Sequence, residues 1–356
     1  MQARPSLRFT RRQLLATLAS SAFAAEPRNQ SFPLRGIEGQ LTPPEMFFVR
    51  EHFNEPDISL STWRLRIEGR VDRPLTLSLS DLIESRTTKI EAVLECAGNV
   101  AGGSGVSNGL WEGVPLGDLL NQAGAHPEAA SILLVGSDHG RLLQSSPVLP
   151  YARLVPIDKC RDAKTLIAFQ LNGRLLPRQN GFPARALLPA WYGMDSVKWL
   201  QRIVVLAKDE VPPEYRASGM DRVYTRAQLP SGANQPLVTR VSVLQVKSVI
   251  SWPLEGAALP PGQYTVRGFA WSGTPVQGVG FSDDGGRTWR AAWIEAPQKD
   301  FGWVRWSVAW TPTPGEHVLL SRASDEAGNL QPLERDRARK DGYELNACTP
   351  VPCSVA

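Results

Sequence analysis

A single cysteine at the end of a short apolar segment is the residue best placed to do chemistry. Residues 91–96 have the composition of a short strand, and Ala97, Gly98 and Asn99 follow Cys96 as a tight turn. Rigid scaffolds place reactive groups where a strand opens into a loop. A thiolate there suits a soft metal ligand or a nucleophile. No histidine lies nearby in the sequence to activate a nucleophile, and a buried structural thiol is the remaining interpretation.

Other reactive patterns are weak. Residues 105–109 match G-x-S-x-G around Ser107, but that pattern needs a buried strand before the serine, and residues 101–104 have a loop composition. The dinucleotide pattern G-x-G-x-x-G is missing. The four cysteines and four histidines have no zinc-ligand spacing. Cys348 and Cys353 are either a disulfide or two free thiols.

The segments that must position Cys96 mix strands with helices. Residues 77–84 and 116–123 predict helices, the second ending at Gly124. Alternating or apolar runs predict strands at residues 63–69, 91–96, 132–136, 165–171 and 197–207. Because helices and strands do not alternate regularly, we predict an α+β fold rather than a doubly wound sheet.

After a Gly/Pro-containing boundary at residues 231–236, the pattern becomes purely β. Strands are predicted at residues 241–250, 262–271, 278–282, 288–295, 302–310 and 316–323, with a hairpin turn at 283–286. This spacing predicts a β-sandwich. Seven of the eleven tryptophans lie between Trp252 and Trp310. We expect the core of one small sandwich to bury fewer than seven tryptophans. The remaining tryptophans therefore predict an interface and a homodimer.

Length and charge exclude several function classes. The 356 residues suit two domains, and 42% hydrophobic with 21% charged residues is ordinary globular composition. The net charge of +4 resides in residues 1–25, which hold four arginines and no acid, leaving 35 basic against 35 acidic residues. We therefore expect no nucleic-acid partner. No run of about 18 uncharged apolar residues predicts a membrane span.

Residues 1–25 have the features of an export signal. Arg11 and Arg12 precede a mildly apolar run, and Ala22, Phe23 and Ala24 form a small-residue cleavage pattern. The paired arginines favour the twin-arginine route over an ordinary secretory signal. That route carries proteins already folded, usually around a cofactor. We expect a periplasmic mature chain.

Residues 94–99 resemble the L-x-C-A-G-N motif of the sulfite oxidase family of molybdenum enzymes. The likeness covers about residues 35–347, through segments 47–52, 172–177, 180–185, 189–200, 247–253, 268–273, 283–289 and 325–332. It implies a molybdopterin-binding catalytic domain at residues 30–235. An immunoglobulin-like dimerisation domain would follow at residues 237–345.

The resemblance implies roles for individual residues. Cys96 would be the thiolate ligand of molybdenum. Phe48, Arg50 and His52 would line the molybdopterin, with Arg50 also reaching the substrate. The other implied cofactor-binding residues are Asp138, Asn180, Arg185, Ser196, Val197 and Lys198. Tyr224 best matches the active-site tyrosine, and Tyr215 is the alternative.

The function implied is oxidation of sulfite or a related sulfur compound by oxygen-atom transfer, with a small sulfur oxyanion as the expected substrate. The haem motif C-x-x-C-H is missing, so we expect no haem in this chain and electron transfer to a separate c-type cytochrome. Two alternatives are a reductase of S-oxides or N-oxides and an exported, non-catalytic β-sandwich binding protein. Val100 and Ala101 stand where many family members have arginines, and residues 341–343 replace the C-terminal arginine region of the animal members.

Overall fold

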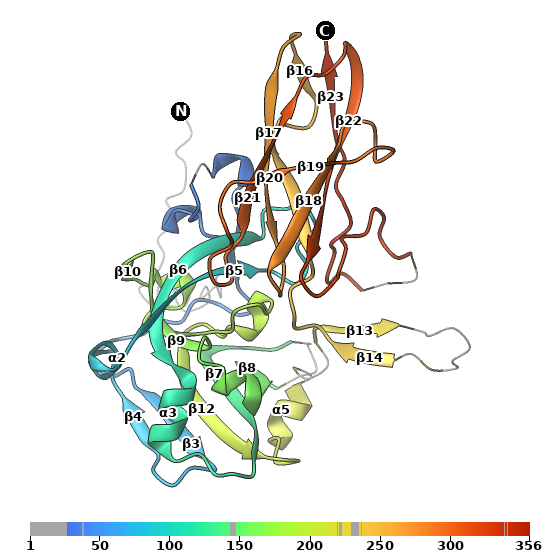
Figure 1. Ribbon diagram of the computed structural model, residues 1–356. Helices are drawn as coiled ribbons and strands as arrows, with labels where there is room; N and C mark the ends of the chain where they lie inside the picture. Colours follow the sequence, from blue (N-terminus) through green and yellow to red (C-terminus); the bar gives the residue numbers. More distant parts are fainter. Residues whose placement is uncertain are drawn as a thin grey trace, which may run out of the picture.

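The chain folds into an α+β body and a body made of strands (Figure 1). The computed structural model describes residues 27–356 except 38, 143–146, 219, 221–222, 229–234, 236, 338 and 340. The predicted export signal at residues 1–25, and all but Gln235 of the predicted boundary at 231–236, lie outside the described residues. Within the described part, no helix has the length and apolar character that crossing a membrane requires.

One sheet of the α+β body carries Cys96 at its end. Its strand order is β10-β9-β6-β5, with β11 paired to β9. The strands are β5 (Thr88–Glu95), β6 (Val106–Pro115), β9 (Leu166–Leu171), β10 (Arg174–Leu175) and β11 (Arg185–Leu187). β5 and β6 are antiparallel, and Glu95 pairs with Val106. The chain therefore turns over at residues 96–105.

A second sheet, ordered β4-β3-β12-β7-β8, packs against the first. Its strands are β3 (Leu65–Gly69), β4 (Leu75–Leu77), β7 (Ala129–Gly140), β8 (Leu149–Pro156) and β12 (Leu200–Ala207). The predicted strands at 63–69, 132–136 and 197–207 are thus confirmed with shifted ends. The helices are α2 (Leu79–Glu84), α3 (Leu116–Ala123), α4 (Ile157–Arg161) and α5 (Pro213–Ser218).

The two predicted helices form for local reasons. Ser78 Oγ accepts from the Asp81 amide at 3.2 Å, and Asp81 Oδ2 accepts from the Ser78 amide at 2.7 Å, which caps the start of α2. α3 buries Leu116, Leu119, Leu120 and Ala123 on one face. Gly124 ends α3 with φ of 68°, a left-handed conformation that favours glycine.

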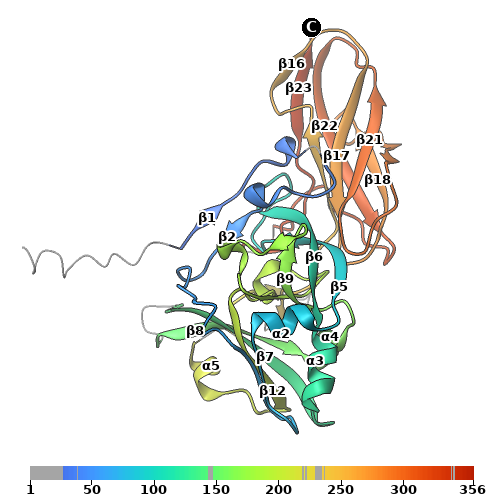
Figure 2. The ribbon, with the colours of Figure 1, turned by 90° about the vertical axis from the view of Figure 1, so that its left-hand side faces the viewer.

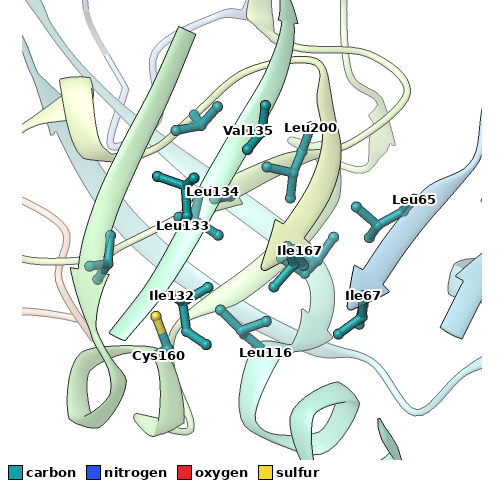
Figure 3. Close-up of a cluster of buried hydrophobic side chains, with 14 of the residues drawn as sticks. Leu65, Ile67, Leu116, Ile132, Leu133, Leu134, Val135, Cys160, Ile167 and Leu200 are labelled. Atoms are coloured by element: carbon teal, nitrogen blue, oxygen red, sulfur yellow. The ribbon is translucent and has the colours of Figure 1, made fainter. Parts of the chain in front are cut away.

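The main core lies between these two sheets (Figure 3). Leu65 and Ile67 of β3, residues 132–135 of β7 and Leu200 of β12 meet Ile167 of β9 there. β9 is buried on both faces, since Leu166 and Ala168 belong to a second apolar cluster with Leu94. The strand before Cys96 is therefore anchored in packed apolar surface.

Short elements join these sheets to the site. Two separate antiparallel strand pairs are described. One is β1 (Asn29–Gln30) with β2 (Val49–Arg50), and the other is β13 (Thr225–Gln228) with β14 (Leu237–Arg240). Four 3₁₀ turns are described: η1 (Leu34–Gly36), η2 (Pro44–Met46), η3 (Arg178–Asn180) and η4 (Gly193–Asp195).

The C-terminal body is two sheets around one core, standing on the end of the α+β body where β5 ends and β6 begins (Figure 2). The first sheet is β15 (Lys247–Trp252), β17 (Tyr264–Trp271), β21 (Val304–Trp310) and β20 (Trp293–Ile294), in that order. The second is β16 (Ala257–Leu259), β23 (Val351–Val355), β22 (Gly315–Asp325), β18 (Val276–Ser282) and β19 (Arg290–Ala291). The strand predicted at 288–295 is two short strands in different sheets, and β23 was not predicted.

Most of the seven tryptophans of the C-terminal body are fully or partly buried within the chain. Trp306 and Trp310 fill the sandwich core, while Trp271 and Trp303 are at most 1% exposed in a cluster between the two bodies. Of the seven, Trp293 alone is largely exposed, at 71%. The argument that unburied tryptophans mark a dimer interface is therefore wrong for most of them.

Candidate active site

The turn after β5 is held by hydrogen bonds around Cys96. The Cys96 amide donates to Gly105 O, and the Asn99 amide donates to Cys96 O, both at 2.9 Å. Asn99 Oδ1 in turn accepts from the Gly105 amide at 2.9 Å. A Cβ on Gly103 would lie 2.5 Å from Asn99 Oδ1, so the close turn requires glycine there. Cys96 is half-buried and faces a pocket.

That pocket collects every residue to which the resemblance gave a role, except the alternative tyrosine Tyr215. It holds about 720 Å³ of empty space, including its open mouth. The predicted residues lining it are Phe48, Arg50, His52, Cys96, Asp138, Asn180, Arg185, Ser196, Val197, Lys198 and Tyr224. Tyr215 does not line it; its hydroxyl accepts from the Leu154 amide at 3.3 Å. Of the two candidate tyrosines, only Tyr224 reaches the pocket.

One wall of the pocket is cationic and buried. Arg185 is 5% exposed and donates to Asn180 O at 3.0 Å and Ser196 O at 2.7 Å, with no carboxylate partner among the described residues. Burial lowers its pKa to about 9. Lys198 donates to Gln179 O at 2.9 Å, and burial lowers its pKa to about 8. Lys198 also lies 3.5 Å from Glu51, so Arg185 is the buried cation that still needs an anionic partner.

Two buried acceptors on the pocket also lack partners. Asp138 Oδ1 and Asn180 Oδ1 have no hydrogen bond in the described structure, although these residues are 4% and 2% exposed. Burial raises the pKa of Asp138 to about 7. Orphaned acceptors in native sites call for a ligand with donors. A ligand with a negative end and N–H groups, as molybdopterin has, fits this donor and acceptor set.

His52 and Tyr224 form a polar pair at the pocket. The Tyr224 hydroxyl is hydrogen-bonded to His52 Nε2, and the His52 ring lies 5.0 Å from that of Tyr151. Burial, reinforced by Arg50 and other cations, lowers the pKa of His52 to about 4. Burial raises the pKa of Tyr224 above its usual value. At neutral pH the histidine is therefore uncharged and the tyrosine is a protonated donor.

Several residues of the site were missed from the sequence. Tyr151 and Trp199 line the pocket, and Tyr151 donates to Met194 O at 2.9 Å. Arg153 is 2% exposed, pairs with Asp195 at 2.7 Å and lies 5.2 Å from the centre of the Tyr224 ring. Tyr151 and Arg153 are two positions apart on β8 and so share one of its faces, but residues 149–156 show no polar–apolar alternation that would have predicted the strand.

Ser107, at the centre of the G-x-S-x-G match, is a structural residue. It lies inside β6 and is 1% exposed. Its Oγ accepts from the Phe48 amide at 3.0 Å. Ser107 thus helps to fix a pocket-lining segment and has no nucleophile geometry.

We expect His52 to make the stability of the cofactor-free protein depend on pH. Its pKa is lowered from 6.5 to about 4, so between these values the unfolded chain binds the proton more tightly. Stability is then complete above about pH 6.5 and falls as the pH drops towards 4, by at most about 3 kcal/mol. Urea unfolding at pH 7 and pH 5 measures this. The wild type should lose more stability than His52→Gln, and equal losses would contradict the assignment.

Two family models match the chain. The oxidoreductase molybdopterin binding domain matches residues 52–213, and the Mo-co oxidoreductase dimerisation domain matches residues 239–339. The first match contains most of the pocket, and the second contains most of the sandwich. The fold and the site therefore define the class as molybdopterin-dependent oxidoreductases.

Named relatives indicate the family within this class of oxidoreductases. A sulfite oxidase of chicken (Gallus gallus) is 34% identical over 338 residues, covering 87% of this chain and 71% of that protein. The mitochondrial sulfite oxidase of mouse (Mus musculus) is 31% identical over 342 residues, and the match spans only 60% of its length. The sulfane dehydrogenase SoxCD of Paracoccus pantotrophus superposes with a TM-score of 0.77 at 28% identity, covering 93% of this chain and 85% of that one. The chain belongs to the sulfite oxidase family, and its cofactor is molybdenum-molybdopterin.

Proposed function

We propose that this protein is a periplasmic enzyme that oxidises sulfite or a related sulfur oxyanion and passes the electrons to a c-type cytochrome. The observation that carries the proposal is the convergence of Cys96, Arg50 and Tyr224 on one pocket. The names of the relatives, a sulfite oxidase and a sulfane dehydrogenase, support a sulfur compound as substrate. The net half-reaction takes sulfite and water to sulfate, two protons and two electrons.

The cofactor would be held by the metal ligand, the buried cations and the unpartnered acceptors of the pocket. Cys96 supplies the thiolate that binds the metal. Arg185 and Lys198 neutralise the anionic end of the pterin, while Asp138 and Asn180 accept from its N–H groups. When bound, the cofactor supplies the two-electron centre for oxygen-atom transfer.

The remaining residues act on the substrate. Arg50 is the exposed cation of the pocket and has no carboxylate partner among the described residues, so it can bind an oxyanion. Tyr224 keeps its proton and donates either to His52 or to an oxygen of the substrate. His52, being neutral, does not compete with Arg50 for the anion.

Turnover of the loaded enzyme tests this proposal. The purified protein should contain one molybdenum per chain and should reduce a c-type cytochrome when sulfite is added. Thiosulfate and an S-oxide supplied with a reduced dye provide the comparison substrates. Turnover of the S-oxide with none of sulfite or thiosulfate would reverse the proposed direction, and a metal-free protein would favour a non-catalytic binding role.

Export is expected to depend on the paired arginines. The double variant Arg11→Lys, Arg12→Lys should accumulate in the cytoplasm at its precursor length, because the twin-arginine route reads that pair. Fractionation of the bacterial host with immunoblotting measures the distribution. An unchanged periplasmic yield would point to the ordinary secretory route.

We expect a homodimer formed through the immunoglobulin-like sandwich. The match of residues 239–339 to a dimerisation domain supports it. Near-zero net charge outside residues 1–25 leaves self-association unopposed. Light scattering at micromolar concentration should give twice the mass of one chain. A mass of one chain would remove the dimer and leave the active-site assignments untouched.

A further inference from the structure

A buried ion pair joins the sandwich to the residue before Cys96. Glu95 ends β5 and Lys247 begins β15, and both side chains are 0% exposed. Lys247 Nζ lies 2.5 Å from Glu95 Oε1. The two residues are 152 positions apart in the chain. A fully buried pair is expensive to desolvate, and apolar side chains of similar size would often stabilise the fold as well. The pair therefore needs a reason beyond stability.

The hydrogen bonds around Glu95 reach the Cys96 turn. Glu95 Oε1 also accepts from Asn99 Nδ2 at 3.0 Å, and Lys247 Nζ donates to Asn99 O at 2.9 Å. Glu95 Oε2 accepts from Trp271 Nε1 of β17 at 2.9 Å. Asn99 in turn holds the Gly105 amide, whose own carbonyl accepts from the Cys96 amide. Lys247 and Trp271 thus act on the turn from one side.

Residues of the segment between β22 and β23 also hold the turn. The Glu344 amide donates to Ala97 O at 2.9 Å, and Thr349 Oγ1 donates to Ala101 O at 2.6 Å. Each of these bonds comes from the C-terminal part of the chain and ends on a residue within five positions of Cys96. Two side chains of the C-terminal part, those of Lys247 and Thr349, therefore hydrogen-bond the turn in addition to the bonds that the α+β body supplies.

We propose that Lys247 and Trp271 are positioning residues for the Cys96 thiolate, and that the sandwich completes the metal site of its own chain. The inference rests on Cys96 as the metal ligand. Neither residue lines the pocket, so neither touches substrate. Their effect passes through Glu95 and Asn99, which set the direction in which Cys96 points. Supporting groups of this kind commonly decide how well a metal ligand is held.

Two matched tryptophan variants test the proposal. Trp271→Phe removes the Nε1 donor to Glu95. Trp303→Phe removes a donor in the same buried cluster, at 0% exposure, whose partner is Gln40 O at 2.8 Å rather than Glu95. A purely structural role predicts equal effects, because both variants lose one buried hydrogen bond and the same aromatic volume. A positioning role predicts that only Trp271→Phe changes Cys96.

Two readouts follow Cys96 directly in the full-length chain. In cofactor-free protein, iodoacetamide alkylation followed by peptide mapping should be faster at Cys96 in Trp271→Phe by about threefold or more, the rise in local opening that one lost hydrogen bond produces. Cys160, Cys348 and Cys353 are buried and report global unfolding in the same sample. In the loaded enzyme, the sulfur-to-metal charge-transfer band and the Mo–S distance from X-ray absorption should shift in Trp271→Phe and stay at wild-type values in Trp303→Phe.

A charge-neutral pair variant provides the second test. Glu95→Gln with Lys247→Met removes both buried charges together, which avoids leaving one unpaired, so it is usable if Trp271→Phe fails to fold. It should retain less molybdenum after gel filtration and show the same faster alkylation. Alkylation of Cys96 at the wild-type rate, together with an unshifted charge-transfer band, in either folded variant would overturn the proposal. Failure to oxidise sulfite would refute only the proposed substrate, because the alkylation and the band do not depend on it.

Discussion

Replacing Cys96 with serine is expected to yield a folded protein that has lost more than about a hundredfold in turnover. A thiolate is a soft donor, and a hydroxyl is a poor substitute for it on molybdenum. Loss of groups that merely support a metal ligand commonly costs ten- to hundredfold, so loss of the ligand itself should cost at least as much. Cys96 is half-buried at the start of a turn, so the exchange of sulfur for oxygen should barely disturb packing. Turnover and molybdenum content of the same preparation measure the effect.

Cys348→Ser is the control for that exchange. Cys348 is buried and unpaired, lies outside the pocket and donates its amide to Pro332 O. Its variant should keep both cofactor and turnover, with some loss of stability because a hydroxyl is buried. A molybdenum-loaded Cys96→Ser protein with undiminished turnover would reject Cys96 as the ligand.

The elements with a clear local sequence pattern were predicted correctly. The helix α3 was confirmed because four apolar residues share one face and Gly124 follows. The strand β23 was missed because Pro350, Pro352 and the closely spaced Cys348 and Cys353 give it the composition of a loose tail. In the structure β23 lies between β16 and β22, so its pairing partners supply the order that its composition does not predict.

The same distinction explains what was found of the site. The resemblance supplied residues from six separated segments, and the fold brings all of them except the alternative Tyr215 to one pocket. Tyr151 and Arg153 belong to β8, for which no strand was predicted, so nothing in the sequence placed them there. The pairing of Glu95 with Lys247 depends on how the two bodies meet, which no local pattern encodes. Trp271 and Trp303 are buried at the same junction within one chain. The number of tryptophans in the sequence had instead predicted an interface between chains.

Replacing Arg50 with methionine is expected to lower kcat/KM for sulfite by roughly ten- to a hundredfold, mainly through a higher KM. A hydrogen bond to a charged group contributes about 1.5–3 kcal/mol, which is the basis of that range. The other cations of the pocket are less exposed than Arg50: Arg185 donates to three backbone carbonyls, and Lys198 lies 3.5 Å from Glu51. Val100 and Ala101 follow the Cys96 motif, so no arginine stands there to share the anion.

Arg66→Met is the matched control, because Arg66 is exposed on β3 outside the pocket and loses the same charge. It should leave kcat/KM unchanged at moderate salt, where charges separated by more than the Debye length of about 8 Å are screened. The loss in Arg50→Met should also vanish for a neutral sulfur substrate, since a neutral molecule gains nothing from the guanidinium. An unchanged KM for sulfite in Arg50→Met would mean that the anion binds elsewhere on the pocket wall, and Arg185 would then be the next residue to replace.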